Sequence, residues 1–209
     1  MNFFLKKCKP FYFIAEIGIN HNASVKIAKQ LIEAAKFAGC DAVKFQKRNP
    51  KIAVPKNEWD KIRETPWGKM RYIEYKEKME FDFKTYKKIK KFCNKLKIEM
   101  IASPWDIDSV NFLEKLNVPF YKVASASITD FALLKKIKST KKPIIISTGM
   151  STEKEIKKCV KFLGEKNLAI LHCTSTYPAS ASELNLNYIQ KMKKLFKKSV
   201  IGYSGHETN

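Results

Sequence analysis

The sequence predicts an α/β protein built on parallel strands, and two observations support this prediction. Short β-rich runs alternate with amphipathic helical stretches along the whole chain, as in repeated strand–helix–strand units. The 209 residues are 44% hydrophobic and 29% charged, a composition that excludes collagen, low-complexity linkers and wholesale disorder. At this length about 70% of the unfolded surface can be buried on folding.

The first elements are a strand at residues 11–19, a helix and a second strand at residues 42–45. We expect the helix to begin after the N-cap residue Ser24 and to end near Gly39, because aliphatic residues line one face between them. Residues 47–80 break the alternation with three prolines and two tryptophans. We expect a long loop with one short helix there, and loops of this length are often functional.

The alternation resumes after residue 80 with five predicted helices, each with apolar residues along one face and each next to a predicted strand. The capping box of Thr152 with Glu155 predicts the beginning of one of these helices, and Gly164 predicts its end. The remaining strands are predicted at residues 98–102, 120–124, 144–146, 168–171 and 200–203.

The sequence therefore predicts seven strands with six intervening helices. A (β/α)8 barrel has eight of each and typically about 250 residues. We therefore predict a TIM-type barrel truncated after its seventh strand, so that residues 1–209 form a single, incomplete catalytic domain. An open, doubly wound sheet of seven strands is the alternative, although no G-x-G-x-x-G motif follows the first strand.

The chain is strongly basic, with 41 Lys+Arg against 20 Asp+Glu and a net charge of +21. Such a balance suggests a polyanionic partner such as nucleic acid. Only Arg48, Arg63 and Arg71 are arginines, however, and arginine is the residue that reads base edges bidentately. The lysines recur at the spacing of solvated helix faces, so a lysine-rich surface is favoured over a nucleic-acid-binding protein.

Cysteine usage and hydropathy favour a soluble, reduced, cytoplasmic protein. Five cysteines at irregular spacing, without a C-x-x-C pair, predict neither a metal knuckle nor a disulfide scaffold. They are Cys8, Cys40, Cys93, Cys159 and Cys173. No run approaches the ~20 apolar residues of a membrane span, and the order of apolar and basic residues at the N-terminus is the reverse of a signal peptide.

Polar side chains follow every predicted strand, where the active site of a barrel forms. A single serine at such a position is more often a helix cap, and His172 after an apolar pair is favoured as a hydrogen-bonded core histidine. Lys44 and Gln46 are two residues apart and share one side of their strand. The polar residues are Glu16, Asn20, His21, Lys44, Gln46, Ser103, Lys122, Ser125, Ser147, Thr148, His172, Ser175, Tyr177, Ser204 and His206.

Lys44 and Lys122 lie inside apolar strands, where an unpaired charge would cost several kcal/mol. Each is therefore expected to face an anion. One interpretation is a buried ion pair with Glu16. The other is a phosphate or carboxylate site formed by the two lysines and several serine hydroxyls.

Six motifs in order along nearly the whole chain resemble the barrel domain of the sialic acid synthase family. Together they are far more specific than any one of them. They are AEIGINHN at residues 15–22, DAVKFQ at 41–46, YKVAS at 121–125, ISTGM at 146–150, LHCT at 171–174 with Tyr177-Pro178, and GYSGH at 202–206.

The resemblance implies a synthase that joins phosphoenolpyruvate to the open-chain aldehyde of an N-acyl amino sugar similar to N-acetylmannosamine. The products would be a nonulosonic (sialic) acid and phosphate. Glu16 would be the acid/base group, Gln46 and Tyr177 would face the sugar, and Ser175 would be a further substrate-binding residue. Phosphoenolpyruvate would be bound by Lys44, Ser103, Lys122, Ser125, Ser147 and Ser204.

The resemblance also implies a cofactor and a quaternary structure. His206 would be one of two histidines on a divalent metal ion, Mn²⁺ with Mg²⁺ or Co²⁺ as alternatives, which polarises the aldehyde. The second histidine and another acidic residue belong to the eighth-strand side of the family barrel. A C-terminal antifreeze-like domain, absent from these 209 residues, closes the partner's site in a homodimer.

The chain departs from the family pattern at three positions. Ser127 stands where the family often has a glutamate that contacts the sugar, and Ser175 stands where it has an asparagine. Gly205 replaces an aspartate that commonly precedes the metal histidine. The first two leave the identity of the sugar open. A non-catalytic fragment of such an enzyme is the alternative function, and the nucleic-acid binder is a weaker one.

Overall fold

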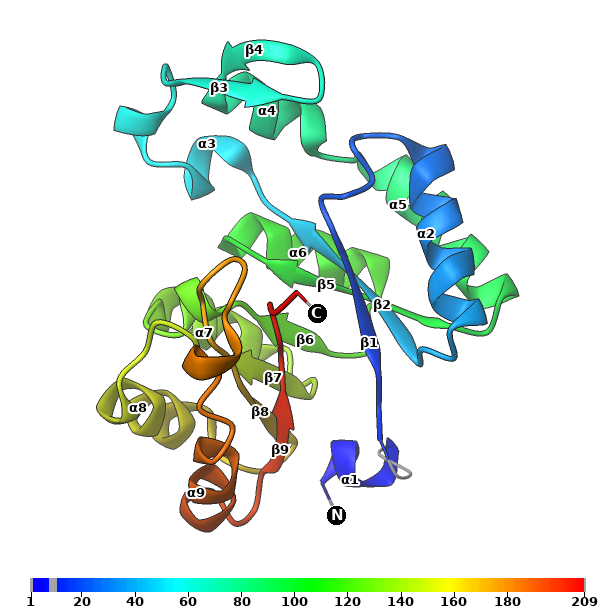
Figure 1. Ribbon diagram of the computed structural model, residues 1–209. Coiled ribbons are helices and arrows are strands. Elements are labelled where there is room, and N and C mark those ends of the chain that lie inside the picture. The colour runs from blue at the N-terminus through cyan, green and yellow to red at the C-terminus, as the bar shows by residue number, and fades with distance from the viewer. Residues whose placement is uncertain (1, 8–10, 209) are drawn as a thin grey trace. The chain divides into compact units, whose positions relative to one another are not determined.

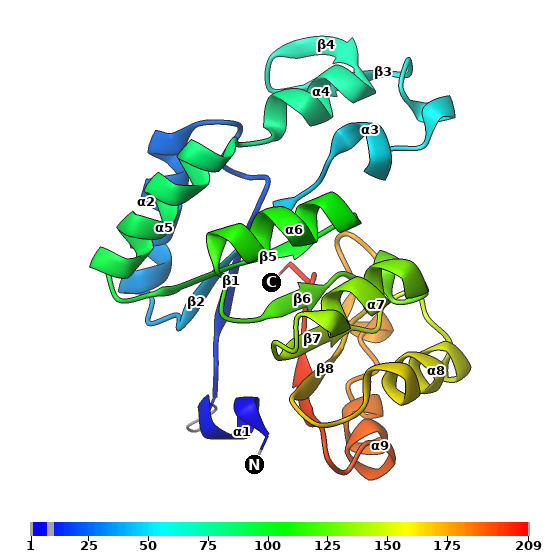
Figure 2. The same ribbon diagram turned by 180° about the vertical axis from the view of Figure 1, so that it is seen from behind.

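The computed structural model describes residues 2–7 and 11–208, so the predicted free thiol of Cys8 lies outside the described residues. The chain divides into two compact units. We call residues 12–119 the N-terminal unit, and residues 1–11 together with 120–209 the C-terminal unit. Figures 1 and 2 show the helices and strands of both.

The N-terminal unit contains a parallel sheet whose strand order is β1-β2-β5. Its strands are β1 (Ile14–Gly18), β2 (Ala42–Lys47) and β5 (Glu99–Pro104), and its principal helices are α2 (Val25–Phe37), α5 (Phe83–Lys95) and α6 (Ile107–Leu116). In register, Glu16 pairs with Lys44 and Gln46 pairs with Ser103. The sheet therefore brings four predicted site residues to neighbouring positions.

Helix α2 begins as the sequence predicts, because the Ser24 hydroxyl accepts a hydrogen bond of 3.3 Å from the N–H of Ile27. Ala28, Ile32 and Ala35 are its buried face. The buried residues of α5 are Tyr86, Ile89 and Cys93, while most of its lysines are exposed. The helical periodicity thus separates core positions from a lysine-covered surface, as predicted.

Residues 47–80 are more ordered than predicted, and the expectation of a loop with one short helix was wrong. The segment contains α3 (Pro50–Ala53), the 3-10 helix η1 (Lys56–Glu58), an antiparallel hairpin of β3 (Ile62–Thr65) and β4 (Gly68–Arg71), and α4 (Tyr72–Met79). The hairpin turn contains Gly68 at a φ of +90°. Most residues of both strands are exposed, so the apolar alternation that signals a half-buried strand is missing.

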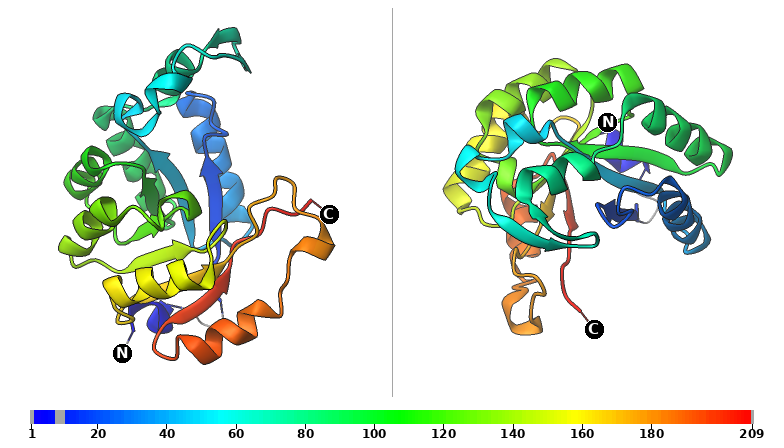
Figure 3. Two further views of the ribbon diagram at one scale, coloured as in Figure 1. Left: turned by 90° about the vertical axis from the view of Figure 1, so that its left-hand side faces the viewer. Right: turned by 90° about the horizontal axis from the view of Figure 1, so that it is seen from above.

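The C-terminal unit contains a parallel sheet with the strand order β6-β7-β8-β9. Figure 3 gives two further views of it. Its strands are β6 (Tyr121–Val123), β7 (Ile144–Ser147), β8 (Leu168–His172) and β9 (Val200–Tyr203), and its helices are α1 (Phe3–Lys7), α7 (Phe131–Ser139), α8 (Glu153–Leu163) and α9 (Tyr188–Leu195), with the 3-10 helices η2 (Ser125–Ser127) and η3 (Ala181–Glu183).

Two details of the C-terminal unit bear on the predictions. The capping box that begins α8 is confirmed, since Thr152 and Glu155 exchange hydrogen bonds between side chain and backbone. Helix α1 was not predicted. Its preceding residue Asn2 donates hydrogen bonds of 3.2 Å to the carbonyls of Leu168 and Lys198, which anchors it to the rest of the unit.

The strand order has a consequence for the type of α/β fold. In both parallel sheets, spatial order follows chain order without reversal. Right-handed crossovers between strands that progress in one direction leave their helices on one side of the sheet. A doubly wound sheet instead reverses its strand order and has helices on both faces. Each unit therefore has the one-sided arrangement of a barrel. The parallel α/β class is confirmed.

No helix in residues 2–7 or 11–208 is both long and apolar enough to cross a lipid bilayer. The four described cysteines, Cys40, Cys93, Cys159 and Cys173, are free thiols.

Candidate functional site

In the N-terminal unit, the predicted site residues converge around the Lys44 ammonium group. Its Nζ lies 2.7 Å from Glu16 Oε2 and donates a hydrogen bond of 3.2 Å to Ser103 Oγ. Lys44 and Ser103 are 3% and 1% exposed, whereas about half of the Glu16 side chain is exposed. The predicted ion pair with Glu16 therefore exists, and its carboxylate is accessible to solvent.

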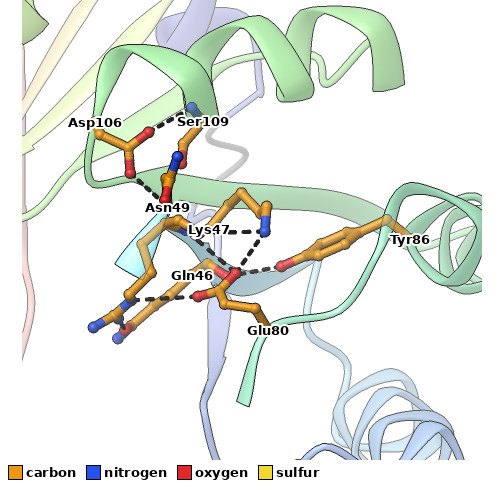
Figure 4. Close-up of polar contacts among 8 residues, drawn as sticks. Gln46, Lys47, Asn49, Glu80, Tyr86, Asp106 and Ser109 are labelled. Carbon is orange, nitrogen blue, oxygen red and sulfur yellow. Dashed lines mark hydrogen bonds and ion pairs between the residues drawn. The ribbon is translucent and has the colours of Figure 1, made fainter. Parts of the chain in front are cut away.

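Gln46 continues this row toward the carboxyl end of β2. Its backbone carbonyl accepts a hydrogen bond of 2.7 Å from the hydroxyl of Tyr86, as Figure 4 shows, and its side-chain oxygen accepts one from the guanidinium group of Arg48. Sequence reasoning missed Arg48 as a site residue. Its other partner, Glu80, is 32 residues away along the chain, so no local motif indicates the pair.

Glu80 lies between two cations. Its carboxylate is 2.7 Å from Lys47 Nζ and 3.4 Å from Arg48 Nε. Burial raises the pKa of Glu80, against the effect of the two cations, and burial lowers the pKa of Arg48. Arginine nevertheless stays protonated in proteins. The cluster is therefore a buried ionic group at the end of β2.

His21 follows β1 and is buried, with 3% of its surface exposed. Its ring stacks on Phe81 at a centroid distance of 4.3 Å, and its Nδ1 accepts a hydrogen bond of 3.1 Å from the N–H of Ala23. Burial lowers the pKa of His21 to about 4. The imidazole is therefore neutral at pH 7, with the proton on Nε2, and is not a cation for anion binding.

In the C-terminal unit, buried polar groups gather at the carboxyl ends of β6 and β7. Lys122 and Ser147 are 8% and 2% exposed. Ser147 Oγ is buried and has no hydrogen-bond partner among the described residues. A buried hydroxyl without a partner is costly, so this oxygen fits a group that binds a ligand.

Gly149 allows three side chains to converge after β7. A Cβ at this position would lie 2.0 Å from Ser175 Oγ, 2.9 Å from Ser125 Oγ and 3.2 Å from Cys173 Sγ. The Gly149 N–H donates a hydrogen bond of 3.0 Å to Ser125 Oγ. The structure therefore brings together two of the predicted serines, and it explains the glycine of the ISTGM motif, to which sequence reasoning assigned no role.

His206 and Tyr177 form a pair in the same unit. The Nδ1–H of His206 donates to the carbonyl of Thr174 at 2.8 Å, which fixes the tautomer and leaves Nε2 as an acceptor. The Tyr177 hydroxyl donates to that Nε2 at 2.8 Å, and the two rings lie 4.1 Å apart. Tyr177 is 72% exposed. Ser204 lies just before His206, and its N–H donates to the carbonyl of His172.

His172 has the structural role that its apolar surroundings predict. It is 7% exposed, and its Nε2–H donates to the carbonyl of Leu184 at 2.7 Å. A pocket of about 590 Å³ lies beside the carboxyl ends of β7 and β8 and is lined in part by His172, Ser175 and Thr148. The pocket is large enough for a small ligand.

His206 fits one ligand position of a metal site. A histidine whose Nδ1–H is bonded to a carbonyl has Nε2 free to bind a metal ion, but in this structure the Tyr177 hydroxyl occupies the Nε2 of His206. However, the described residues contain no group of three His, Cys, Asp or Glu side chains that could hold a metal ion. The described part of the chain therefore contains no complete metal site of three such side chains.

Parallel strands in chain order, with buried lysine and serine side chains toward their carboxyl ends, define a class: α/β proteins of the barrel type. Within that class, the chain belongs to the NeuB family, whose model matches residues 31–209.

Individual relatives agree with this assignment. The chain is 39% identical over 201 residues to an N-acetylneuraminate-9-phosphate synthase of Drosophila melanogaster, covering 94% of this chain and 54% of that protein. It is 36% identical to an N,N'-diacetyllegionaminic acid synthase of Campylobacter jejuni, covering 95% and 61%. A crystal structure of a sialic acid synthetase from Leptospira borgpetersenii has a TM-score of 0.84 at 29% identity, covering 94% and 65%.

The sequence-based assignment to the sialic acid synthase family is thereby confirmed. The chain spans little more than half the length of the curated relatives it matches. Because the names of these relatives include different sialic-acid-type products, membership of the family does not define the sugar.

Proposed function

We propose that the protein condenses phosphoenolpyruvate with an N-acyl amino sugar similar to N-acetylmannosamine, forming a nonulosonic acid and releasing phosphate. The observation that carries this proposal is the buried Ser147 hydroxyl, which has no hydrogen-bond partner among the described residues, close along the sheet to the buried Lys122. A phosphate or carboxylate oxygen would accept a hydrogen bond from this hydroxyl and would be attracted by the nearby ammonium group. Family membership supports the reaction class.

The residues of each unit have distinct roles in this proposal. In the N-terminal unit, Lys44 and Ser103 bind an anionic oxygen of phosphoenolpyruvate. In the C-terminal unit, Lys122 supplies a second cation, and the other anion-binding residues are Ser125, Ser147 and Ser204. Hydroxyl and ammonium donors fixed by the sheet stabilise the charge that develops on the departing phosphate.

The chemistry forms one carbon–carbon bond. The methylene carbon of phosphoenolpyruvate attacks the aldehyde carbon, and the aldehyde oxygen takes up a proton. Water then adds to C2, and phosphate leaves. Glu16 transfers protons near the carbon that water attacks, since its carboxylate is half exposed and is held 2.7 Å from Lys44. Gln46, Ser175 and Tyr177 face the sugar.

The proposal includes a divalent metal ion, with Mn²⁺ preferred over Mg²⁺ or Co²⁺, which would polarise the aldehyde oxygen. His206 Nε2 would be one ligand, with further ligands from outside the described residues. We also propose that residues 1–209 belong to a single TIM-type barrel in a cytoplasmic enzyme that acts as a homodimer. The one-sided strand order of each sheet supports the barrel.

Phosphate release from phosphoenolpyruvate, measured with N-acetylmannosamine and Mn²⁺ in the full-length protein, tests the reaction. We expect Glu16→Gln and Lys122→Ala to lower the rate at least 100-fold. Lys91→Ala removes an exposed lysine of α5 and should leave the rate unchanged. If the full-length protein releases no phosphate with any 2-acylamino hexose, the proposal is wrong.

A further inference from the structure

The side-chain amide of Gln46 has a defined orientation. Its Oε1 accepts a hydrogen bond from the guanidinium of Arg48, and its Nε2 lies 3.7 Å from the position of a Cβ on Gly18. Arginine has only N–H donors, so the amide oxygen must face Arg48 and the NH2 group must point away from it. The backbone carbonyl of Gln46 is fixed in turn by the Tyr86 hydroxyl, as seen in Figure 4.

Arg48 is itself held from several sides. It is 7% exposed, its Nε lies 3.4 Å from Glu80 Oε1, and its guanidinium lies 4.6 Å from the centroid of the Trp105 ring. The backbone N–H of Arg48 also donates to Glu80 Oε2 at 3.4 Å. A planar guanidinium that stacks on a ring and pairs with a carboxylate loses little further freedom when it bonds to Gln46.

Neutralising Glu80 does not require Arg48. Lys47 Nζ already lies 2.7 Å from Glu80 Oε2, and the Lys47 side chain is only 13% exposed. One cation is enough to neutralise one carboxylate. Burying a second cation beside it costs free energy of desolvation. What Arg48 adds to the ion pair and its contact with Trp105 is the hydrogen bond that it donates to Gln46.

We propose that Arg48 is a positioning residue, which Glu80 and Trp105 hold in place and which fixes Gln46 so that its NH2 group, and not its oxygen, faces the substrate. This inference rests on the proposed function in taking Gln46 as a sugar-facing residue. It adds that the substrate presents a hydrogen-bond acceptor to Gln46, such as a carbonyl or hydroxyl oxygen. A substrate group that can only donate would be rejected there.

Steady-state kinetics of the full-length protein test this role with Arg48→Met, Gln46→Ala and the double variant. We expect Arg48→Met to raise the KM for N-acetylmannosamine about three- to tenfold, because one neutral hydrogen bond to the sugar is weakened. The KM for phosphoenolpyruvate should not change. In the Gln46→Ala background, Arg48→Met should add no further increase. Lys51→Met is the matched control, because Lys51 is exposed and forms an exposed ion pair with Glu77 on the same segment.

The side-chain amide signals of Gln46 in ¹⁵N NMR spectra provide a readout that does not depend on turnover. Gln46→Ala assigns them by their disappearance. In Arg48→Met the two amide protons should move toward the shifts of a freely rotating amide, while Arg48→Lys, which keeps a charge and a donor, should restore part of the difference. Arg48→Lys also replaces Arg48→Met if that variant does not fold.

Two results would overturn the inference: additive effects of the Arg48 and Gln46 substitutions on the sugar KM, or Gln46 amide signals that do not change when Arg48 is replaced. If the wild-type protein turns over no N-acyl sugar, the proposed function fails, and the amide signals alone decide whether Arg48 orients Gln46.

Discussion

Ser147 and Ser125 differ in whether the side-chain hydroxyl has a hydrogen-bond partner. This difference should separate effects on ligand binding from effects on folding stability. Ser147 Oγ is buried without a hydrogen-bond partner among the described residues, whereas Ser125 Oγ accepts a hydrogen bond of 3.0 Å from the Gly149 N–H. Removing an unsatisfied hydroxyl removes a desolvation cost, but removing an acceptor leaves an N–H unpaired. The two serines should therefore respond oppositely to substitution by alanine.

For Ser147→Ala we expect the free energy of unfolding in urea to stay level or to rise by about 1 kcal/mol. The affinity for phosphoenolpyruvate, measured by calorimetry in the full-length protein, should fall about tenfold, because a hydrogen bond to a charged ligand is lost. Ser125→Ala should instead lower the free energy of unfolding by about 1 kcal/mol. An unchanged affinity in Ser147→Ala would exclude this hydroxyl from the anion site.

His21 should make stability depend on pH in a defined interval. Its folded-state pKa of about 4 lies below the ordinary histidine pKa of 6.5, so the unfolded chain binds more protons between these two values. The contribution of the neutral His21 to the free energy of unfolding is fully present above pH 6.5. It is lost as the pH falls toward about 4, at up to about 1.4 kcal/mol per pH unit.

Urea unfolding at several pH values measures this dependence, with His21→Asn as the reference, since asparagine also offers an acceptor for the Ala23 N–H. The wild-type free energy of unfolding should fall more steeply than that of the variant between pH 6.5 and 4. Parallel curves would show that the buried imidazole is not the group that titrates.

At the scale of elements, Asp106 joins the end of β2 to the beginning of α6. One carboxylate oxygen accepts from the Ser109 N–H at 2.7 Å, and the other accepts from the Asn49 N–H at 2.6 Å, as Figure 4 shows. Asp130 caps α7 with one such bond, to the Leu133 N–H at 2.9 Å, and is exposed. Asp106 therefore caps a helix and also links it to the end of a strand, whereas Asp130 caps a helix.

We expect Asp106→Ala to lower the free energy of unfolding by about 2–4 kcal/mol, the sum of a lost N-cap and an unsatisfied N–H. Asp130→Ala should cost about 1 kcal/mol. Asp106→Asn, which keeps one carbonyl acceptor, should fall between the two. Equal losses in Asp106→Ala and Asp130→Ala, measured by urea unfolding, would mean that the contact with Asn49 adds nothing.

The elements that the sequence predicts well share a physical property. Buried strands such as β7 are continuous apolar runs, and helices such as α8 combine an apolar stripe with a cap, so a local pattern identifies each. The β3–β4 hairpin has mostly exposed residues and no such pattern. Helix α1 has five residues and is anchored by hydrogen bonds to residues more than 160 positions away, which no local pattern can indicate.

The candidate site follows the same division at the scale of the whole molecule. Lys44 and Lys122 could be predicted because a charge inside an apolar strand is a local anomaly, and the structure buries both. The predicted partner of Lys44, Glu16, is adjacent in register. Arg48, Glu80 and Gly149 could not be predicted, because their roles depend on side chains that only the tertiary structure brings within contact.

The net charge of +21 leads to a last prediction, on binding to DNA. Arg48 is buried, and the two exposed arginines form ion pairs, Arg63 with Glu58 and Arg71 with Asp60 and Glu74. The exposed positive charge is therefore mainly lysine, which attracts phosphates without reading bases. We expect fluorescence anisotropy to detect DNA binding only at low salt, with equal affinity for unrelated sequences and a steep decrease as NaCl rises from 50 to 200 mM. A specific nucleic-acid-binding protein would instead bind one sequence at least tenfold more tightly than others at 150 mM NaCl. That result would show that the lysine-rich surface is a functional nucleic-acid-binding site.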